Sequence, residues 1–201
     1  MAINLKKGQK INLKKSDGES LNSFCVGANW GVIKSKGFLR KTTIEEVDLD
    51  LSLGLFDASS NCVEIIYFGN LSSKGIKHFG DDLVGDTDGD DGLDNETIQV
   101  TLSNIPDNIE QMVFILNSYK EQDFATIPFA SIRLYEGTPQ EIKEVVATYN
   151  IAKDSKFSGY VSMILGKLSK TEGEWKFSAI GEPTKDKKLR ESIVTVSKKY
   201  L

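Results

Sequence analysis

Histidine and cysteine are scarce in this chain of 201 residues, which has one histidine and two cysteines. Zinc and copper sites are usually built from clustered imidazole and thiolate groups. His78, Cys25 and Cys62 are too far apart in sequence to form such a motif. No partner motif accompanies His78, so we expect it to be an ordinary hydrogen-bonding residue near a strand end. These scarcities argue against a zinc or copper centre and favour a protein that is not an enzyme.

Long hydrophobic runs are also missing. No apolar stretch approaches the roughly 20 residues needed to span a bilayer. Residues 1–15 lack the apolar core and small-residue cleavage site of a signal peptide. Cys25 and Cys62 fall inside apolar, strand-like segments, and without an export signal we expect both to be reduced core residues rather than a disulfide. We therefore expect a cytoplasmic protein.

Basic clusters are absent as well. The formal net charge is −4, but the acidity is local, because residues 81–96 contain eight carboxylates and no basic residue. Without those eight, 21 acidic residues stand against 25 basic ones. No stripe of Lys and Arg with interleaved aromatic residues indicates nucleic-acid binding. The uneven charge therefore favours a localised acidic site.

What is present is a strong period-two pattern, typical of β-strands. Its clearest example is Val47–Leu55, where odd positions are aliphatic and even positions are Asp, Asp, Ser and Gly. Hydrophobic content of 39% suits one globular domain, residues 1–201. Many short strands separated by turn signals predict an all-β fold, an antiparallel β-sandwich. The other predicted strands are 11–13, 24–30, 62–68, 97–102, 112–118, 129–135, 145–149, 160–168 and 174–180.

Helical periodicity is confined to the C-terminal region. From Asp186 to Tyr200, Leu189, Ile193 and Val196 recur at helical spacing with Lys and Arg opposite them. This predicts one amphipathic C-terminal helix, at about residues 185–200, packed on the sheet. We expect its basic face to be solvated, with contact to a membrane or a partner as the alternative. Residues 108–111 form at most a short turn.

The acidic run is the strongest functional signal. Four glycines punctuate it, and two unit charges about 4 Å apart repel by roughly 4 kcal/mol at an effective dielectric near 20. A bent loop that gathers these carboxylates is therefore strained unless a cation lies among them. Oxygen-only ligands on a flexible backbone suit calcium better than magnesium, which requires stricter geometry. The alternative is a plain solvated acidic loop. The eight acids are Asp81, Asp82, Asp86, Asp88, Asp90, Asp91, Asp94 and Glu96.

A second source of ligands is the strand that begins near Val47. Asp48 and Asp50 point to the same side of this strand, and the leucines between and after them point to the core. If the strand end and the acidic loop converge, the two aspartates share ions with the loop, and so many carboxylates suggest two ions. The alternative places both aspartates on the solvated face of an edge strand. The residues that we expect to share ions with Asp48 and Asp50 are Asp81, Asp82, Asp86, Asp90 and Asp91.

Two familiar loop motifs do not fit. An EF-hand that starts at Asp86 would need glycine where Asp91 stands and a glutamate where Thr97 stands. Neither flank of the loop has a helical pattern. A phosphate-binding P-loop also fails, because no Gly-Lys-Ser/Thr follows and the acidic loop would repel phosphate.

At these residues the chain resembles the TerD family of bacterial tellurium-resistance and stress-response proteins. The matching segments are Val47–Ser52, Tyr67–Asn70, and Gly80–Asp86 with its continuation through Gly89-Asp90-Asp91. Gly173–Phe177 and the C-terminal helix also fall where the family has similar features. The resemblance covers nearly the entire length of the chain, and the acidic motif carries it.

The resemblance implies a β-sandwich that binds two calcium ions through Asp48, Asp50 and the loop acids. It also implies that Asn70 is a neighbour of the site and that the gene belongs to a stress-response operon. The sequence departs from the family pattern where Gly92-Leu93-Asp94-Asn95 intervene before Glu96. Either Asp94 or Glu96 therefore supplies the last ligand, and Asp88 is placed to face solvent.

Three functions remain open at the level of sequence. The first is a non-catalytic, calcium-binding stress-response protein that acts through metal-dependent association with partners, among them other products of a stress operon. The second is a module that binds anions or phospholipid headgroups through calcium. The third is a metal-assisted phosphoester hydrolase that uses His78, for which no other residue gives support.

Overall fold

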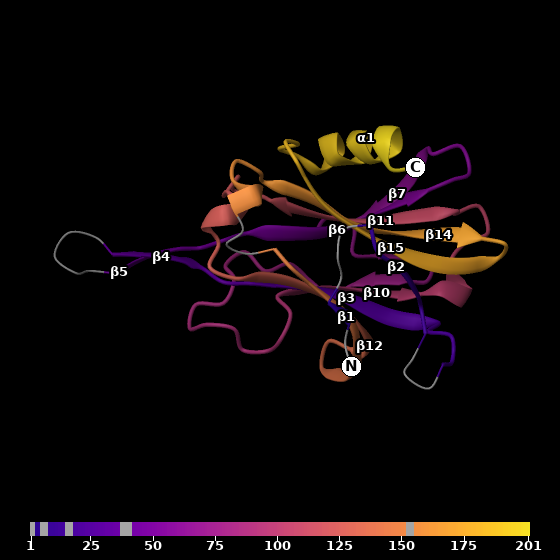
Figure 1. Ribbon diagram of the computed structural model, residues 1–201, viewed down its shortest axis with the longest axis horizontal. Helices are drawn as coiled ribbons and strands as arrows, with labels where there is room; N and C mark the ends of the chain where they lie inside the picture. Colours follow the sequence, from indigo (N-terminus) through magenta and orange to yellow (C-terminus); the bar gives the residue numbers. More distant parts are fainter. Residues whose placement is uncertain (1–2, 5–7, 15–17, 37–41, 152–154) are drawn as a thin grey trace.

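Two β-sheets packed face to face form the body of the protein in the computed structural model (Figure 1). The structure describes residues 3–4, 8–14, 18–36, 42–151 and 155–201. Within these ranges a two-stranded arm projects from one end of the body and a C-terminal helix lies on the outside of one sheet. The predicted fold class, an antiparallel sandwich with an amphipathic C-terminal helix, is confirmed.

The first sheet has seven strands, and all of its pairings are antiparallel except that of β1 with β13. Its central strand β3 (Ser23–Trp30) pairs with β12 on one side and with β10 on the other. In spatial order the remaining strands are β1 (Ile3–Asn4), β13 (Glu141–Asn150) and β12 (Ala130–Thr138) on one side of β3, and β10 (Glu96–Thr101), β9 (Ile76–His78) and β8 (Ser72–Ser73) on the other.

The second sheet has six strands, all antiparallel. Its strand β6 (Leu49–Phe56) lies between β11 and β7 and corresponds to the clearest period-two pattern of the sequence. In spatial order the strands are β2 (Lys10–Asn12), β15 (Glu174–Thr184), β14 (Ser162–Thr171), β11 (Gln111–Ser118), β6 and β7 (Cys62–Ile66).

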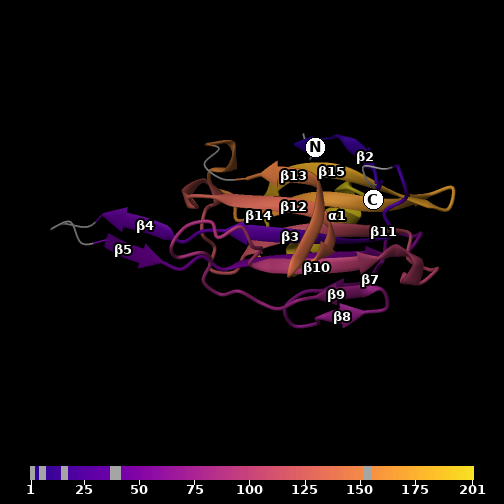
Figure 2. The ribbon, with the colours of Figure 1, turned by 90° about the horizontal axis from the view of Figure 1, so that it is seen from below.

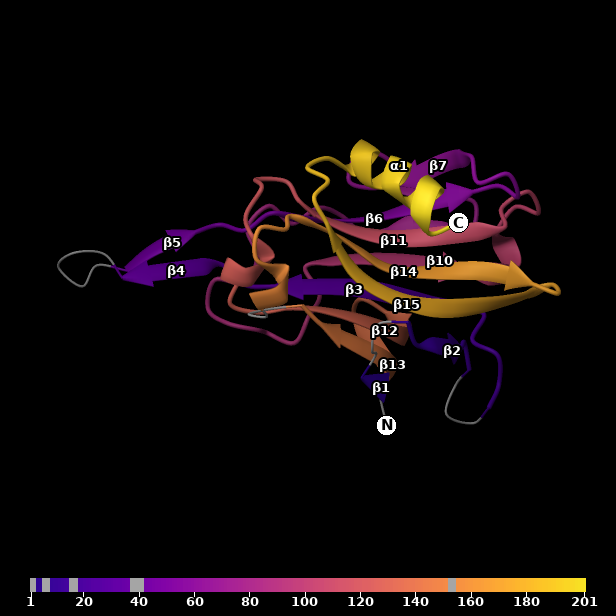
Figure 3. The same cartoon turned by 45° about the horizontal axis from the view of Figure 1, so that its top comes forward.

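The helix α1 (Leu189–Lys199) covers the outer face of the second sheet (Figure 3). It begins three residues later than the predicted start at Asp186. Lys187 instead donates its backbone N–H to Glu191 Oε2, across the turn that leads into the helix. Ile193 and Val196 are buried against the sheet, as the helical spacing predicts. The short 3₁₀ turns are η2 (Leu102–Asn104), η3 (Phe124–Thr126) and η4 (Ser155–Phe157).

Strand β6 is buried at every position, although its sequence alternates between apolar and polar residues. Leu49, Leu51 and Leu53 fill the core between the sheets. The opposite face is buried by α1, whose Ile193 would lie 2.8 Å from a Cβ added at Gly54. A second apolar cluster under the helix has these buried members: Phe56, Val113, Ile115, Ile164, Ile193 and Val196. The polar residues of β6 are therefore enclosed rather than solvated.

One prediction about the cysteines is wrong. Both thiols are free, and Cys25 is buried in β3 as expected. Cys62, however, is exposed, because it begins the edge strand β7, whose first two residues both lie at the surface.

Strands β4 (Ile33–Lys36) and β5 (Thr42–Glu45) form a hairpin arm that the sequence pattern did not predict. They pair only with each other, and Figure 2 shows the arm extending beyond the body of the sandwich. All four described residues of β5 are exposed. Without a buried face, the segment has no apolar alternation to signal a strand. Across the described residues, no helix is long and apolar enough to cross a membrane.

Candidate metal centre

The acidic loop between β9 and β10 is attached to the start of β6 and the end of β3 by backbone hydrogen bonds. Val47 donates to the Val84 carbonyl at 2.9 Å, and Asp86 donates to the Trp30 carbonyl at 2.9 Å. Val32 in turn donates to the Asp86 carbonyl at 3.2 Å. These bonds bring the loop beside Asp48 and Asp50, so the predicted convergence of the strand end and the loop is present in the fold.

The side chain of Trp30 lies directly beneath this loop. Its indole is fully buried and its Nε1 donates to the Val47 carbonyl at 2.8 Å. Gly85 crosses directly above the indole with φ +81°, and a Cβ at this position would lie 2.6 Å from the Trp30 Cδ1. Only glycine combines this backbone conformation with so close an approach. The contact fixes the height of the loop above the core.

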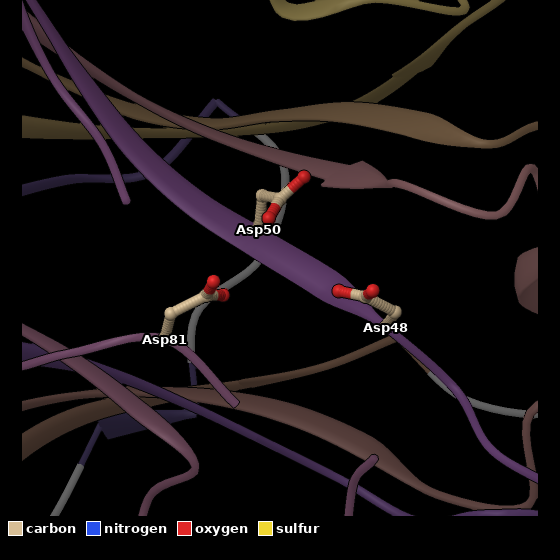
Figure 4. Close-up of side chains that lie close together, drawn as sticks. All are labelled: Asp48, Asp50 and Asp81. Atoms are coloured by element: carbon tan, nitrogen blue, oxygen red, sulfur yellow. The ribbon is translucent and has the colours of Figure 1, made fainter. Parts of the chain in front are cut away.

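The first carboxylate cluster consists of Asp48, Asp50 and Asp81. One carboxylate oxygen from each lies within 4.8 Å of the others. Figure 4 shows Asp81 pointing from its loop toward the space between Asp50 of β6 and Asp48, which immediately precedes β6. Asp48 is only 3% exposed, and its Oδ1 has no hydrogen-bond partner. A buried carboxylate oxygen without a partner is costly, so this oxygen indicates a missing ligand.

Electrostatics at this cluster disfavour three bare carboxylates. Burial, followed by the charges of Glu96, Asp48 and Asp81, raises the pKa of Asp50 to about 8. Burial also raises the pKa of Asp48, although Lys120 opposes the increase from 4.0 Å away. A bound cation would relieve both the repulsion and the desolvation.

The second cluster consists of Asp86, Asp90 and Asp91, again with oxygens within 4.8 Å of one another. It is more exposed than the first. Asn29 on β3 donates to Asp90 Oδ1 at 2.9 Å, while its own side-chain oxygen is buried without a partner. Burial also raises the pKa of Asp86. The loop thus forms two separate groups of acids.

Asp82 lies between the clusters and supports the loop. Its Oδ1 accepts the N–H groups of Val84 and Gly85, each at 2.9 Å. Burial raises its pKa, but the N–H of Gly85, the amide of Asn95 and the N–H of Val84 outweigh this effect, so the pKa of Asp82 is lowered overall. We therefore place Asp82 beside the clusters as a loop-forming carboxylate.

Asn95 is a connecting residue that the sequence pattern did not single out. Its Nδ2 donates to Asp82 Oδ2 at 3.0 Å and to Asp86 Oδ1 at 3.1 Å, and its Oδ1 accepts the Trp30 N–H at 2.8 Å. Asn95 therefore connects Asp82, the neighbour of Asp81 of the first cluster, to Asp86 of the second cluster. The sequence did not predict this role, because the pattern of charges identifies carboxylates and Asn95 is an uncharged residue between two of them.

Glu96 is buried in the core beside the loop. Its carboxylate accepts the N–H of Leu51 at 2.8 Å and the N–H of Asp82 at 3.3 Å. His78 Nε2 lies 3.4 Å from Glu96 Oε2 and 3.1 Å from the Leu51 carbonyl, while His78 Nδ1 accepts the Gly80 N–H. Both ring nitrogens are thus used in holding the loop. Glu96 belongs to neither cluster of three.

Asp94 anchors the end of the loop on the first sheet. Arg133 Nε donates to Asp94 Oδ1 at 2.7 Å, and Arg133 Nη2 donates to the Gly92 carbonyl at 2.8 Å. The carboxylate lies directly on Gly27, where a Cβ would clash with it. Of the two residues considered for the last ligand, Glu96 is therefore occupied by protein groups. Asp94 is paired through Oδ1 with Arg133, whereas its buried Oδ2 has no hydrogen-bond partner.

The two remaining sequence candidates belong to neither cluster. Asn70 donates its side-chain amide to Glu64 Oε1 at 3.2 Å and to the Ile65 carbonyl at 2.9 Å, in the turn after β7. Asp88 is exposed in the loop and belongs to neither cluster. The structure thus brings together six of the predicted ligands: Asp48, Asp50, Asp81, Asp86, Asp90 and Asp91.

These groups fit a hard divalent cation. Every ligand atom in the two clusters is a carboxylate oxygen, and three carboxylates supply up to six of the roughly 6–8 oxygens that calcium takes. The unpartnered oxygen of Asp48 indicates a missing group at the first cluster. The acidic clusters are therefore compatible with metal binding.

Comparisons with known proteins agree with the geometry. The family model of the TerD domain matches residues 1–194. The chain is 36% identical to "Stress response protein SCP2" of Bacillus subtilis, covering 96% of this chain and 98% of the relative. It is 31% identical to "Tellurium resistance protein TerZ" of Serratia marcescens, covering 89% of each. A crystal structure of a homologue of telluride resistance protein from Streptomyces coelicolor A3(2) superposes with a TM-score of 0.63 at 13% identity, covering 90% of this chain and 97% of that one.

Proposed function

Because this chain belongs to the TerD family, we propose that it is a calcium-binding protein whose two carboxylate clusters each hold one ion. The observation that carries the proposal is the first cluster. There, the unpartnered Asp48 Oδ1 and the raised pKa of Asp50 both indicate an absent positive charge. The stress-response and tellurium-resistance names of the relatives support a role in stress.

We propose that the ions act by shaping a recognition surface rather than by catalysis. Both nitrogens of His78 are engaged inside the fold, so the histidine considered for hydrolysis has no ring nitrogen directed to a substrate. When calcium is bound, it offsets two of the three negative charges in each cluster and fixes the acidic loop relative to β6. The partners, which include products of a stress operon, would then bind the metal-loaded protein in the cytoplasm.

Titration calorimetry on metal-free protein tests the proposal. We expect uptake of two calcium ions at micromolar concentration and weaker uptake of magnesium. Asp81→Asn is expected to remove one binding event and Asp90→Asn the other, because each substitution deletes a charge from one cluster. Asp88→Asn is the matched control, since this exposed aspartate is in neither cluster. If neither ion is taken up, the proposal fails.

A further inference from the structure

The surface around the first cluster is unusually apolar. Phe68, Leu83 and Tyr119 surround it with exposed fractions of 40%, 55% and 65%. We call these three residues the apolar rim. Large apolar side chains gathered at one exposed place often mark an interaction site. The rim comes from three separate segments, so it is a product of the fold and not of one hydrophobic stretch.

Contacts place the rim beside the cluster. The Tyr119 N–H donates to the Asp48 carbonyl at 2.9 Å, and the rings of Phe68 and Tyr119 meet edge to face with centroids 6.0 Å apart. Leu83 lies two residues beyond Asp81, and its carbonyl accepts the Lys120 ammonium at 3.1 Å. Lys120 Nζ is also 4.0 Å from Asp48 Oδ2. Apolar, cationic and carboxylate groups therefore share this end of the sandwich.

The hairpin arm supplies further positive charge. Lys34 lies opposite Ile44 and Lys36 opposite Thr42, and side chains directly opposite each other in an antiparallel pair share a face. One face of the arm thus combines two exposed lysines with Ile44, which is 52% exposed. We call it the cationic face. Such a mixture of cationic and apolar groups suits the boundary between anionic headgroups and hydrocarbon.

The arm and the clusters lie at the same end of the molecule. A groove of about 380 Å³ runs between the base of the arm and the acidic loop, and its lining includes Lys34, Asp86 and Phe129. Asp48 follows the end of β5 by only three residues. The base of the arm, with Lys34, therefore lies beside the acidic loop.

We propose that this end of the sandwich docks on an anionic phospholipid bilayer when calcium fills the clusters. This inference rests on the proposed function, because bare carboxylates would be repelled by anionic lipid. One calcium ion offsets two of the three negative charges of a cluster and keeps coordination positions for phosphate oxygens, since three carboxylates do not always complete its shell. The apolar rim then enters the headgroup boundary, and the cationic face adds electrostatic attraction.

Charge complementarity favours a bilayer over a protein partner. Lys34 and Lys36 are exposed cations on the arm, whereas Lys120 is already paired with Glu46 at 3.7 Å and with Asp48 at 4.0 Å. A bilayer of anionic lipid has negatively charged headgroups at its surface and hydrocarbon beneath them. This arrangement matches a protein surface on which lysines alternate with exposed apolar side chains. A protein partner at the same surface is the competing outcome that the experiment has to distinguish.

Vesicle cosedimentation with the full chain tests the inference. The vesicles are phosphatidylcholine alone, or phosphatidylcholine with about 30% phosphatidylserine, each with calcium or with chelator. We expect pelleting only with phosphatidylserine and calcium together. Phe68→Ser combined with Tyr119→Ser should weaken partitioning at least tenfold, because two exposed aromatic side chains no longer enter the boundary. Lys34→Gln combined with Lys36→Gln should weaken partitioning onto the vesicles by about fivefold for each lysine removed.

Matched controls come from the solvent face of α1. Val194→Ser removes an equally exposed apolar side chain, and Lys198→Gln with Lys199→Gln removes two exposed lysines. These variants should pellet like the unaltered chain. Circular dichroism confirms folding of each variant, and calorimetry confirms that the rim variant still takes up calcium.

The possible results separate the two proposals. No calcium uptake would defeat the proposed function and this inference with it. Calcium uptake without pelleting on phosphatidylserine vesicles would overturn the inference alone, and would point to a protein partner at the rim. Pelleting that is indifferent to calcium, or equal in the rim and control variants, would also overturn it.

Discussion

The aspartates of this protein differ in role because their surroundings differ, although they stand close together in sequence. Asp82 accepts two backbone N–H groups and shapes the loop, whereas Asp94 pairs with Arg133. Asp48 is buried with one carboxylate oxygen unpartnered, and burial raises the pKa of Asp50 to about 8. The position of each acid relative to the other carboxylates, rather than residue type, thus separates the structural acids from the candidate ligands.

Gly85 offers a test of how the loop is positioned. Gly85→Ala should destabilise the protein by more than about 2 kcal/mol, because left-handed backbone costs about 1–2 kcal/mol for a residue with a Cβ and the methyl would also meet Trp30. Calcium affinity should fall as the loop shifts. Chemical unfolding and calorimetry measure the two effects.

Gly89→Ala is the control for this prediction. Gly89 also has positive φ, but a Cβ there meets nothing within 4 Å. The Gly89→Ala variant should therefore lose only the stability that the backbone conformation costs, without an added loss from a steric clash. Equal losses of stability in the two variants would contradict a supporting role for the contact between Gly85 and Trp30.

At the scale of elements, the arm extends away from the body of the protein, whereas the helix packs on it. Strands β4 and β5 pair only with each other, whereas α1 buries apolar side chains of β11 and β14 on the outer face of the second sheet. The first element is therefore positioned for interaction and the second for stability. The length of an element therefore does not predict which of these two roles it has.

Replacing residues 34–44 by Asn-Gly tests the role of the arm. Ile33 and Glu45 lie directly opposite each other, so a two-residue type I′ turn can join them. We expect the thermal midpoint to change by only a few degrees and calcium uptake to persist, because the core and clusters stay intact. Thermal scanning and calorimetry provide these measurements.

A chain that ends at Lys188 provides the contrast. Loss of α1 exposes Val113, Ile115 and Ile164, so this truncation should lower the midpoint far more than loss of the arm. If removal of the arm destabilises the protein as strongly as removal of the helix, the arm contributes to the core and is not a separate interaction element.

At the scale of the whole molecule, the buried acids couple folding to pH. Burial raises the pKa of Asp50 from an ordinary 3.8 to about 8, so the metal-free folded state holds a proton that the unfolded state has lost. The associated stability is complete below about pH 4 and is lost as pH rises through 8. Asp48 and Asp86 act in the same direction, and Asp82, whose pKa is lowered, acts in the opposite direction.

We therefore expect metal-free protein to be less stable at pH 8.5 than at pH 5 by at least about 1.4 kcal/mol, the equivalent of one pKa unit. Asp50→Asn should remove most of this difference, because the amide does not ionise. Saturating calcium should restore stability at pH 8.5, since ion binding displaces the proton. Urea unfolding at the two pH values measures these changes, and a metal-free protein whose stability rises with pH would contradict a raised pKa at Asp50.

The sequence by itself determined the sandwich class, most of its strands and the C-terminal helix, because period-two and helical patterns record which face of an element is buried. It also identified the acids, since charge density is visible without coordinates. The sequence did not reveal the arm, whose strands have no buried face, or the exposure of Cys62, which depends on the place of β7 at the sheet edge.

Only the tertiary structure decided how the acids divide. Six of them form two clusters, while Glu96 and Asp94 turn toward Leu51 and Arg133, residues that are distant in sequence. The alternation around Asp50 predicts a polar face but says nothing about the acids of other segments that surround it, Asp81 and Glu96. Carboxylate roles depend on neighbours brought in by the fold, and a linear pattern of charges does not contain those neighbours.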